Sequence, residues 1–159
     1  MMERGRNFLN CEYPIICGAM TWVSEPGLVA AVCNAGAFAC LAGGNTPPDI
    51  LRQQIAETRK LTDKPFGVNL ITVAPIYQEH LKMLPELNLD YVIFAGSFPR
   101  DHEVKIAKDS GAKVMCFAST LSIAKRMMRF GADAIILEGS EAGGHIGHVS
   151  AMVLLQQIL

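Results

Sequence analysis

Short apolar runs recur along this chain at nearly even intervals, and this rhythm constrains the fold more than any other feature. Each run is four or five residues long and apolar almost throughout. Such runs are typical of strands that are buried on both faces, as in parallel sheets. They occupy residues 14–17, 38–41, 66–70, 91–95, 114–118 and 134–137. The sequence therefore predicts six strands in a parallel sheet.

Segments with helical spacing separate the predicted strands. One helix is predicted over residues 26–34. Another is predicted over residues 47–60, with Thr46 as the N-cap and Pro47 at the first helical position. Strands and helices therefore alternate along the chain.

The segment 120–130 shows the helical pattern most clearly. Leu121, Ala124 and Met128 are spaced so that they lie on one face of a helix, and Thr120 precedes them as an N-cap. The sequence therefore predicts a helix over this segment.

Three of the predicted helices end in a Gly-Ala pair that leads directly into a strand. Gly36, Gly111 and Gly131 hold the position just past a helix, where a left-handed backbone is common and only glycine has no side-chain penalty. The repetition indicates an internal repeat of one strand and one helix.

Two architectures use such a repeat. A doubly wound open sheet usually carries a G-x-G-x-x-G loop after its first strand, and "GAMTWVSEP" has a single glycine there. A (β/α)8 TIM barrel gathers functional residues at the carboxyl ends of many strands. We expect one domain over residues 1–159 with this α/β barrel architecture, incomplete because about six of the eight units are present.

Charge and cysteine content exclude several classes of protein. Fourteen basic and fifteen acidic residues leave a net charge of −1, which does not favour nucleic acid as a partner. The most hydrophobic segment, residues 28–43, is interrupted by Asn34 and Gly36 and is too short to span a membrane. Five scattered cysteines without a C-x-x-C motif are typical of free thiols in a reducing compartment, so we expect a cytoplasmic protein.

Polar side chains and glycines stand where predicted strands end. The Gly18-Ala19-Met20 segment follows the first strand, Asn69 interrupts the third, and Glu138 comes directly after the last. The Asn69 amide has two open interpretations, a hydrogen bond to a neighbouring loop or a contact with a cofactor ring. A carboxylate beside a buried strand is costly unless it is paired, which favours a functional interpretation of Glu138.

His145 is the strongest candidate for a catalytic residue. Histidine takes up and returns a proton near neutral pH, and the neighbouring Gly143 and Gly144 allow the backbone to approach a ligand closely. Glu141 is expected to be solvated or to act as a local cap, and His148 is expected to be exposed.

The other two histidines, His80 and His102, are expected to lie on the surface. None of the four histidines has a metal-ligand spacing with a cysteine or a carboxylate, so no metal site is predicted. The phosphate-binding loop of nucleotide triphosphatases is absent from the sequence.

The motifs "EGSEAGGHIG", "YPIICGAM", "FGVNL" and "ADAIILEG" together resemble the nitronate monooxygenase (2-nitropropane dioxygenase) family. They are equally similar to the related FMN-dependent enoyl-ACP reductases of bacterial fatty-acid synthesis. The resemblance extends from residue 13 to the end of the chain and implies a (β/α)8 barrel with FMN across its carboxyl rim. Two positions depart from it, because Cys17 and Glu138 stand where many nitronate monooxygenases have glutamine.

The resemblance implies a role for each candidate residue. Catalysis is assigned to His145 as the acid/base that faces the substrate. Contacts with FMN are assigned to Gly18, Ala19, Met20, Asn69, Glu138, Gly143 and Gly144.

Three functions follow as expectations. The first is oxidation of alkyl nitronates by oxygen, and the second is reduction of an enoyl thioester with a nicotinamide cofactor. The third is an inactive fragment or flavin-binding remnant, since two of eight units are missing after Leu159. In that case we expect weak FMN binding, and self-association or a second chain that completes the barrel.

Overall fold

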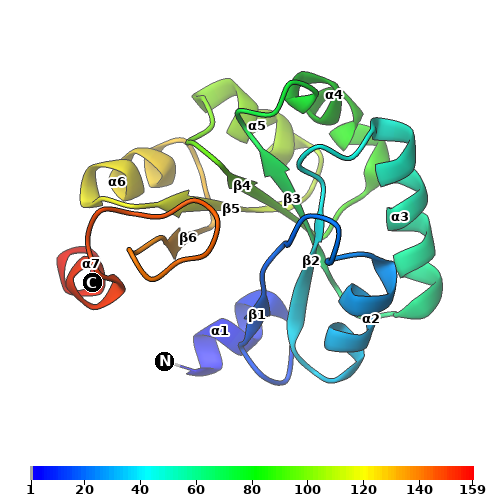
Figure 1. Ribbon diagram of the computed structural model, residues 1–159, viewed down its shortest axis with the longest axis horizontal. Helices are drawn as coiled ribbons and strands as arrows, with labels where there is room; N and C mark the ends of the chain where they lie inside the picture. Colours follow the sequence, from blue (N-terminus) through cyan, green and yellow to red (C-terminus); the bar gives the residue numbers. More distant parts are fainter. Residues whose placement is uncertain (1) are drawn as a thin grey trace.

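The computed structural model describes residues 2–159 as a curved sheet of six parallel strands with helices on its outer side (Figure 1). The strands lie side by side in the order in which they occur along the chain, and each pairs in parallel with the next. This arrangement is an incomplete TIM barrel, as the sequence predicted.

The elements alternate along the whole chain. Strands are β1 (Ile16–Cys17), β2 (Phe38–Ala42), β3 (Gly67–Ile71), β4 (Tyr91–Ala95), β5 (Lys113–Ala118) and β6 (Ala134–Leu137). Helices are α1 (Met2–Leu9), α2 (Pro26–Asn34), α3 (Pro48–Leu61), α4 (Tyr77–Leu87), α5 (Asp101–Asp109), α6 (Leu121–Arg129) and α7 (Ala151–Ile158). All six predicted strands are present within two residues of their expected bounds.

Local sequence patterns predicted several helix ends correctly. Gly36, Gly111 and Gly131 follow their helices with φ angles of +89°, +89° and +99°, which confirms the predicted left-handed positions. The Thr120 side chain accepts a hydrogen bond from the Ile123 amide at the start of α6, which confirms the predicted cap.

Two details of the predicted helices were wrong. Pro47, not Thr46, is the N-cap of α3, because the Thr46 hydroxyl instead donates to the Ala42 carbonyl 2.9 Å away. On α6, the buried methionine is Met127, whereas Met128 is exposed. Ala124 of the predicted face is buried, whereas Met128 borders an open groove toward α7.

Two apolar cores lie on opposite sides of the sheet. Side chains along β4 alternate between them, so that Val92 and Phe94 face the helices while Tyr91 and Ile93 face the barrel interior. Gly67 makes room for the interior core, since a Cβ atom there would lie 2.4 Å from the Ile93 side chain.

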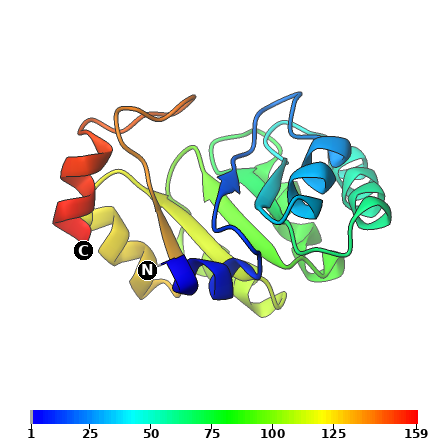
Figure 2. The same cartoon turned by 90° about the horizontal axis from the view of Figure 1, so that it is seen from below.

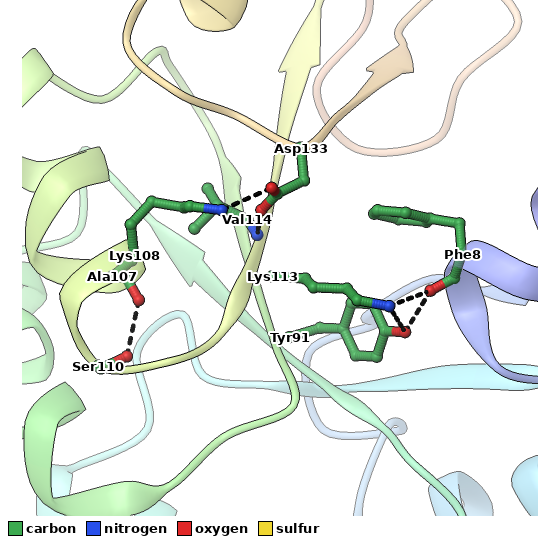
Figure 3. Close-up of polar contacts among 8 residues, drawn as sticks. All are labelled: Phe8, Tyr91, Ala107, Lys108, Ser110, Lys113, Val114 and Asp133. Atoms are coloured by element: carbon green, nitrogen blue, oxygen red, sulfur yellow. Dashed lines mark hydrogen bonds and ion pairs between the residues drawn. The ribbon is translucent and has the colours of Figure 1, made fainter.

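Helix α1 lies across the amino-terminal ends of the strands, opposite the loops that follow β1 and β6 (Figure 2). Figure 3 shows Tyr91 and Lys113 directed at the carbonyl of Phe8, which accepts hydrogen bonds from the Tyr91 hydroxyl at 2.5 Å and the Lys113 ammonium at 2.8 Å. The Phe8 and Phe38 rings both meet Tyr91 edge to face. Helix α1 therefore closes off the interior core at this end of the barrel.

His80 is not a surface residue, and its prediction was wrong. It lies on α4, is fully buried, and its Nε2 is 2.8 Å from the Thr46 carbonyl. Burial lowers the pKa of its imidazole. His102 is exposed, as expected.

The five cysteines are free thiols, of which Cys33, Cys40 and Cys116 are buried. Burial raises the pKa of Cys116 to about 12, so this thiol is not reactive near neutral pH. Within residues 2–159, no helix is both long enough and apolar enough to cross a membrane.

Candidate active site

A cavity of about 660 Å³ opens at the carboxyl ends of the strands. All the residues that the sequence singled out as a site line it together: Gly18, Ala19, Met20, Asn69, Glu138, Gly143, Gly144 and His145. They come from three loops or strands separated by up to 127 positions in the sequence, and only the curvature of the sheet brings them together.

The loop after β1 is fixed by the buried Ser24. Its Oγ accepts a hydrogen bond from the Met20 amide at 2.9 Å and donates one to the Gly18 carbonyl at 3.2 Å. The same loop holds Trp22 at a φ of +65°, which costs a non-glycine residue free energy and persists only where neighbouring contacts impose it. Gly18, Ala19 and Met20 are thus presented to the cavity by a rigid turn.

Asn69 lies on β3 and is only 7% exposed. Its backbone carbonyl accepts the Gly43 amide at 2.9 Å, and a Cβ atom at Gly43 would lie 2.6 Å from that oxygen. Its side chain makes none of the hydrogen bonds found within residues 2–159, so a bond to a neighbouring loop does not account for the amide. The Asn69 side chain borders the cavity with its hydrogen-bonding capacity available for a ligand.

Glu138 and His145 face the cavity from the segment after β6. Partial burial raises the pKa of the Glu138 carboxyl, and the positive charge of a protonated His145 works in the opposite direction. His145 itself is exposed, next to Gly144 at a φ of +78°. A Cβ atom on Gly143 would meet no atom within 4 Å, so the backbone is open toward the cavity here.

The segment 138–150 folds back on itself with the help of two further glycines. The Gly147 amide donates to the Gly139 carbonyl at 3.1 Å, and a Cβ atom at Gly147 would lie 2.0 Å from the Glu138 carbonyl oxygen. Neither glycine could be replaced without moving the backbone that carries His145.

The same segment is anchored to α7. A Glu141 carboxylate oxygen accepts the Ala151 amide at 2.7 Å, which confirms the expected cap and lowers the pKa of this carboxyl. Ser150 caps the same helix by accepting the Val153 amide, and His148 is exposed as expected.

Several cavity residues were not predicted from the sequence. They are Thr21, Gly44, Asn45, Ile71, Ala95, Phe117 and Ala142. Most of them lie at the carboxyl end of a strand or in the loop after it, and that position was the one signal that could have found them. Among residues 2–159, no group of three or more histidine, cysteine or acidic side chains could hold a metal ion.

The sequence model that describes nitronate monooxygenases matches residues 3–84 and 71–159, which together cover almost the whole chain. The chain belongs to the nitronate monooxygenase family. The family resemblance seen in the cavity motifs is thereby confirmed.

Individual relatives and solved structures are similar to the chain over about half of their own length. The (3aS,4S,5R,7aS)-5-hydroxy-7a-methyl-1-oxo-octahydro-1H-indene-4-carboxyl-CoA dehydrogenase of Rhodococcus jostii is 34% identical over 93% of this chain and 42% of its own. A nitronate monooxygenase of Paraburkholderia phytofirmans is 30% identical over 87% of this chain and 48% of its own.

A solved structure, FabK of Thermotoga maritima, superposes with a TM-score of 0.93 at 40% identity, over 98% of this chain and 50% of its own. The chain spans about half the length of these relatives.

Proposed function

We propose that the chain is part of an FMN-dependent oxidoreductase that oxidises alkyl nitronates with molecular oxygen. One observation carries this proposal: a single cavity contains every residue to which the family resemblance assigned a role. Membership of the nitronate monooxygenase family supports the same activity.

The cavity suits the ring of a flavin. Its volume of about 660 Å³ falls within the roughly 300–1,000 Å³ common for small-molecule sites. The open backbone at Gly143 allows a flat ring to lie close, and the Asn69 amide offers both a donor and an acceptor to a ring edge. The Gly18-Ala19-Met20 turn would cover the side of the ring next to β1.

His145 would serve as the acid/base. When bound, FMN accepts the electrons that the substrate loses and passes them to oxygen. His145 removes the acidic proton next to a nitro group or hydrogen-bonds the anion once it has formed. Its exposure beside two glycines gives substrate room to reach the imidazole.

A second candidate is the reduction of an enoyl thioester with a nicotinamide cofactor. The FabK enoyl-ACP reductase neighbour and the carboxyl-CoA dehydrogenase relative support it. So does Glu138, because a carboxylate lining the cavity repels an anionic nitronate more than it repels an uncharged thioester. His145 would then stand near the thioester carbonyl.

Self-association is a further part of the proposal. In the sheet formed by residues 2–159, strands β1 and β6 each pair on one side only, and unpaired strand edges favour pairing with another chain. Sedimentation of the purified chain, with and without FMN, measures its mass in solution and tests this expectation.

One experiment separates the candidates. The flavin-loaded chain is mixed without oxygen with the nitronate of nitroethane and, separately, with NADH or NADPH, while flavin absorbance is followed. Bleaching by the nitronate supports the first function, and bleaching by the nicotinamide alone reverses the order. A chain that binds no flavin would contradict both enzymes and favour the inactive remnant.

A further inference from the structure

A second, smaller cavity of about 270 Å³ opens beside the first. Its lining comes from the segments after β4, β5 and β6 and from α6: Gly96, Ser97, Phe98, Phe117, Ser119, Ile123, Glu138, His145 and Ile146. Phe117, Glu138 and His145 line both cavities. The proposed acid/base therefore stands at the boundary between two compartments.

The wall of the small cavity is built into the fold. Gly96 adopts a φ of +84°, and a Cβ atom there would lie 2.8 Å from the Ile71 side chain, so only glycine turns the chain at this point. The turn brings Phe98 to the rim, where the Arg126 guanidinium lies 5.5 Å from the ring centre. This cation–π contact holds an aromatic side chain that is otherwise 45% exposed.

The lining is mixed in character. Phe98, Ile123 and the 60% exposed Ile146 provide apolar surface around the opening. The hydroxyls of Ser97 and Ser119 take part in none of the hydrogen bonds found within residues 2–159. Large apolar side chains left in water beside a catalytic histidine favour an apolar ligand group at this place.

We propose that this cavity is the subsite for the hydrocarbon chain attached to the reacting carbon of the substrate, which rests on the function proposed above. The hydrocarbon chain lies among Phe98, Ile123 and Ile146, while the reacting carbon remains next to His145 at the boundary between the two cavities. The two serine hydroxyls hydrogen-bond the polar head group as it enters.

The size of the cavity makes it selective. At about 270 Å³ it is less than half the size of the neighbouring cavity of about 660 Å³, so the length of the hydrocarbon chain decides whether a substrate fits. The flavin ring fits the larger compartment and leaves the smaller one to the substrate. The subsite therefore sets a limit on chain length for nitronates and for enoyl thioesters alike.

The test varies both the residues that line the cavity and the length of the substrate's hydrocarbon chain. Ile146→Phe fills the space from an exposed loop position, Ile123→Phe fills it from α6, and Phe98→Ala enlarges it. Nitronates of increasing alkyl length, from nitroethane upward, are assayed with flavin-loaded protein. Calorimetric titration of the flavin-free protein with the corresponding nitroalkanes measures binding without turnover. If the flavin responds only to a nicotinamide, trans-2-enoyl thioesters of increasing length replace the nitronates.

In Ile146→Phe and Ile123→Phe, we expect kcat/KM for the nitronates with the longest alkyl chains to fall roughly tenfold relative to kcat/KM for the shortest. The reason is that the fit of one methylene group in an apolar pocket changes kcat/KM by a factor of about this size. Phe98→Ala shifts the preference toward longer chains. Leu121→Phe is the matched control, since it lies on the same helix but borders the groove toward α7 instead.

An unchanged length profile in the filled and enlarged variants, with flavin bound as in the parent chain, overturns the subsite. A shift in Leu121→Phe as large as in Ile123→Phe overturns it as well. Absence of flavin binding in the parent chain is a different result, because it removes the proposed function itself.

Discussion

The two ends of the barrel are built on opposite principles. At the amino-terminal end, Tyr91 and Lys113 satisfy the Phe8 carbonyl and their side chains pack against aromatic rings. At the carboxyl end, the Asn69 side chain makes none of the hydrogen bonds found within residues 2–159, and His145 is exposed above a cavity. Closed packing gives stability, and unsatisfied polar groups on a rigid frame give binding. Substitutions at the two ends should therefore affect different measurements.

The largest effect is expected from His145→Ala at the open end. Loss of a general acid–base residue lowers turnover by about 10²- to 10⁴-fold, whereas the free energy of unfolding should change by no more than about 0.5 kcal/mol because the side chain is exposed. Steady-state kinetics and urea unfolding measure the two quantities. Near-normal turnover with flavin bound would show that another group moves the proton.

The opposite pattern is expected from Tyr91→Ala at the closed end. Truncation removes the edge-to-face contacts with Phe8 and Phe38 and should cost about 3–5 kcal/mol of unfolding free energy. Tyr91→Phe is the control. It removes only the hydroxyl group and should lower the unfolding free energy by about 1 kcal/mol. Equal costs for both variants would mean that the hydrogen bond, not the packing, closes this end.

Local sequence patterns were sufficient to predict the strands and the left-handed glycines at 36, 111 and 131, because each of these features depends on a few neighbouring residues. The gathering of Asn69 and His145 at one rim followed from barrel geometry. His80 was missed although helical spacing places it on the buried face of α4 with Leu84 and Leu87. Its partner, the Thr46 carbonyl 34 positions away, is visible only in the folded chain. Gly44 and Ala95 carry no chemistry that marks them in a sequence, so only the folded chain assigns them to the cavity.

A smaller effect on stability is expected from the titration of His80. This side chain connects α4 to the loop that carries Gly44 and Asn45 through its contact with the Thr46 carbonyl. Burial lowers the folded-state pKa of this base, so its neutral form stabilises the fold above the unfolded pKa of about 6.5. That stability is lost as the pH falls from about 6.5 toward the lower folded-state pKa. Urea unfolding at several pH values measures the slope.

His80→Gln is the matched variant, because its amide can still donate to the Thr46 carbonyl but does not titrate. The slope of stability against pH below about 6.5 should be shallower in this variant than in the parent chain. Parallel slopes would contradict the role of His80.

The smallest effect on stability is expected from Asn69→Leu. The Asn69 side-chain amide makes none of the hydrogen bonds found within residues 2–159 and borders the open cavity, so its replacement should change the unfolding free energy by no more than about 1 kcal/mol. Flavin affinity should fall at the same time, since the amide was available to the ring. A clear loss of stability would show that Asn69 is a structural residue.

Titration of the chain with FMN, followed by flavin fluorescence, tests the central claim most directly. Gly143→Phe places a ring in the open cavity without a backbone penalty, and Gly27→Phe adds the same ring on the outer surface of α2. We expect the dissociation constant to rise roughly tenfold or more in Gly143→Phe and to stay unchanged in Gly27→Phe. Equal FMN affinity in the two variants would contradict a flavin site at the open end of the barrel.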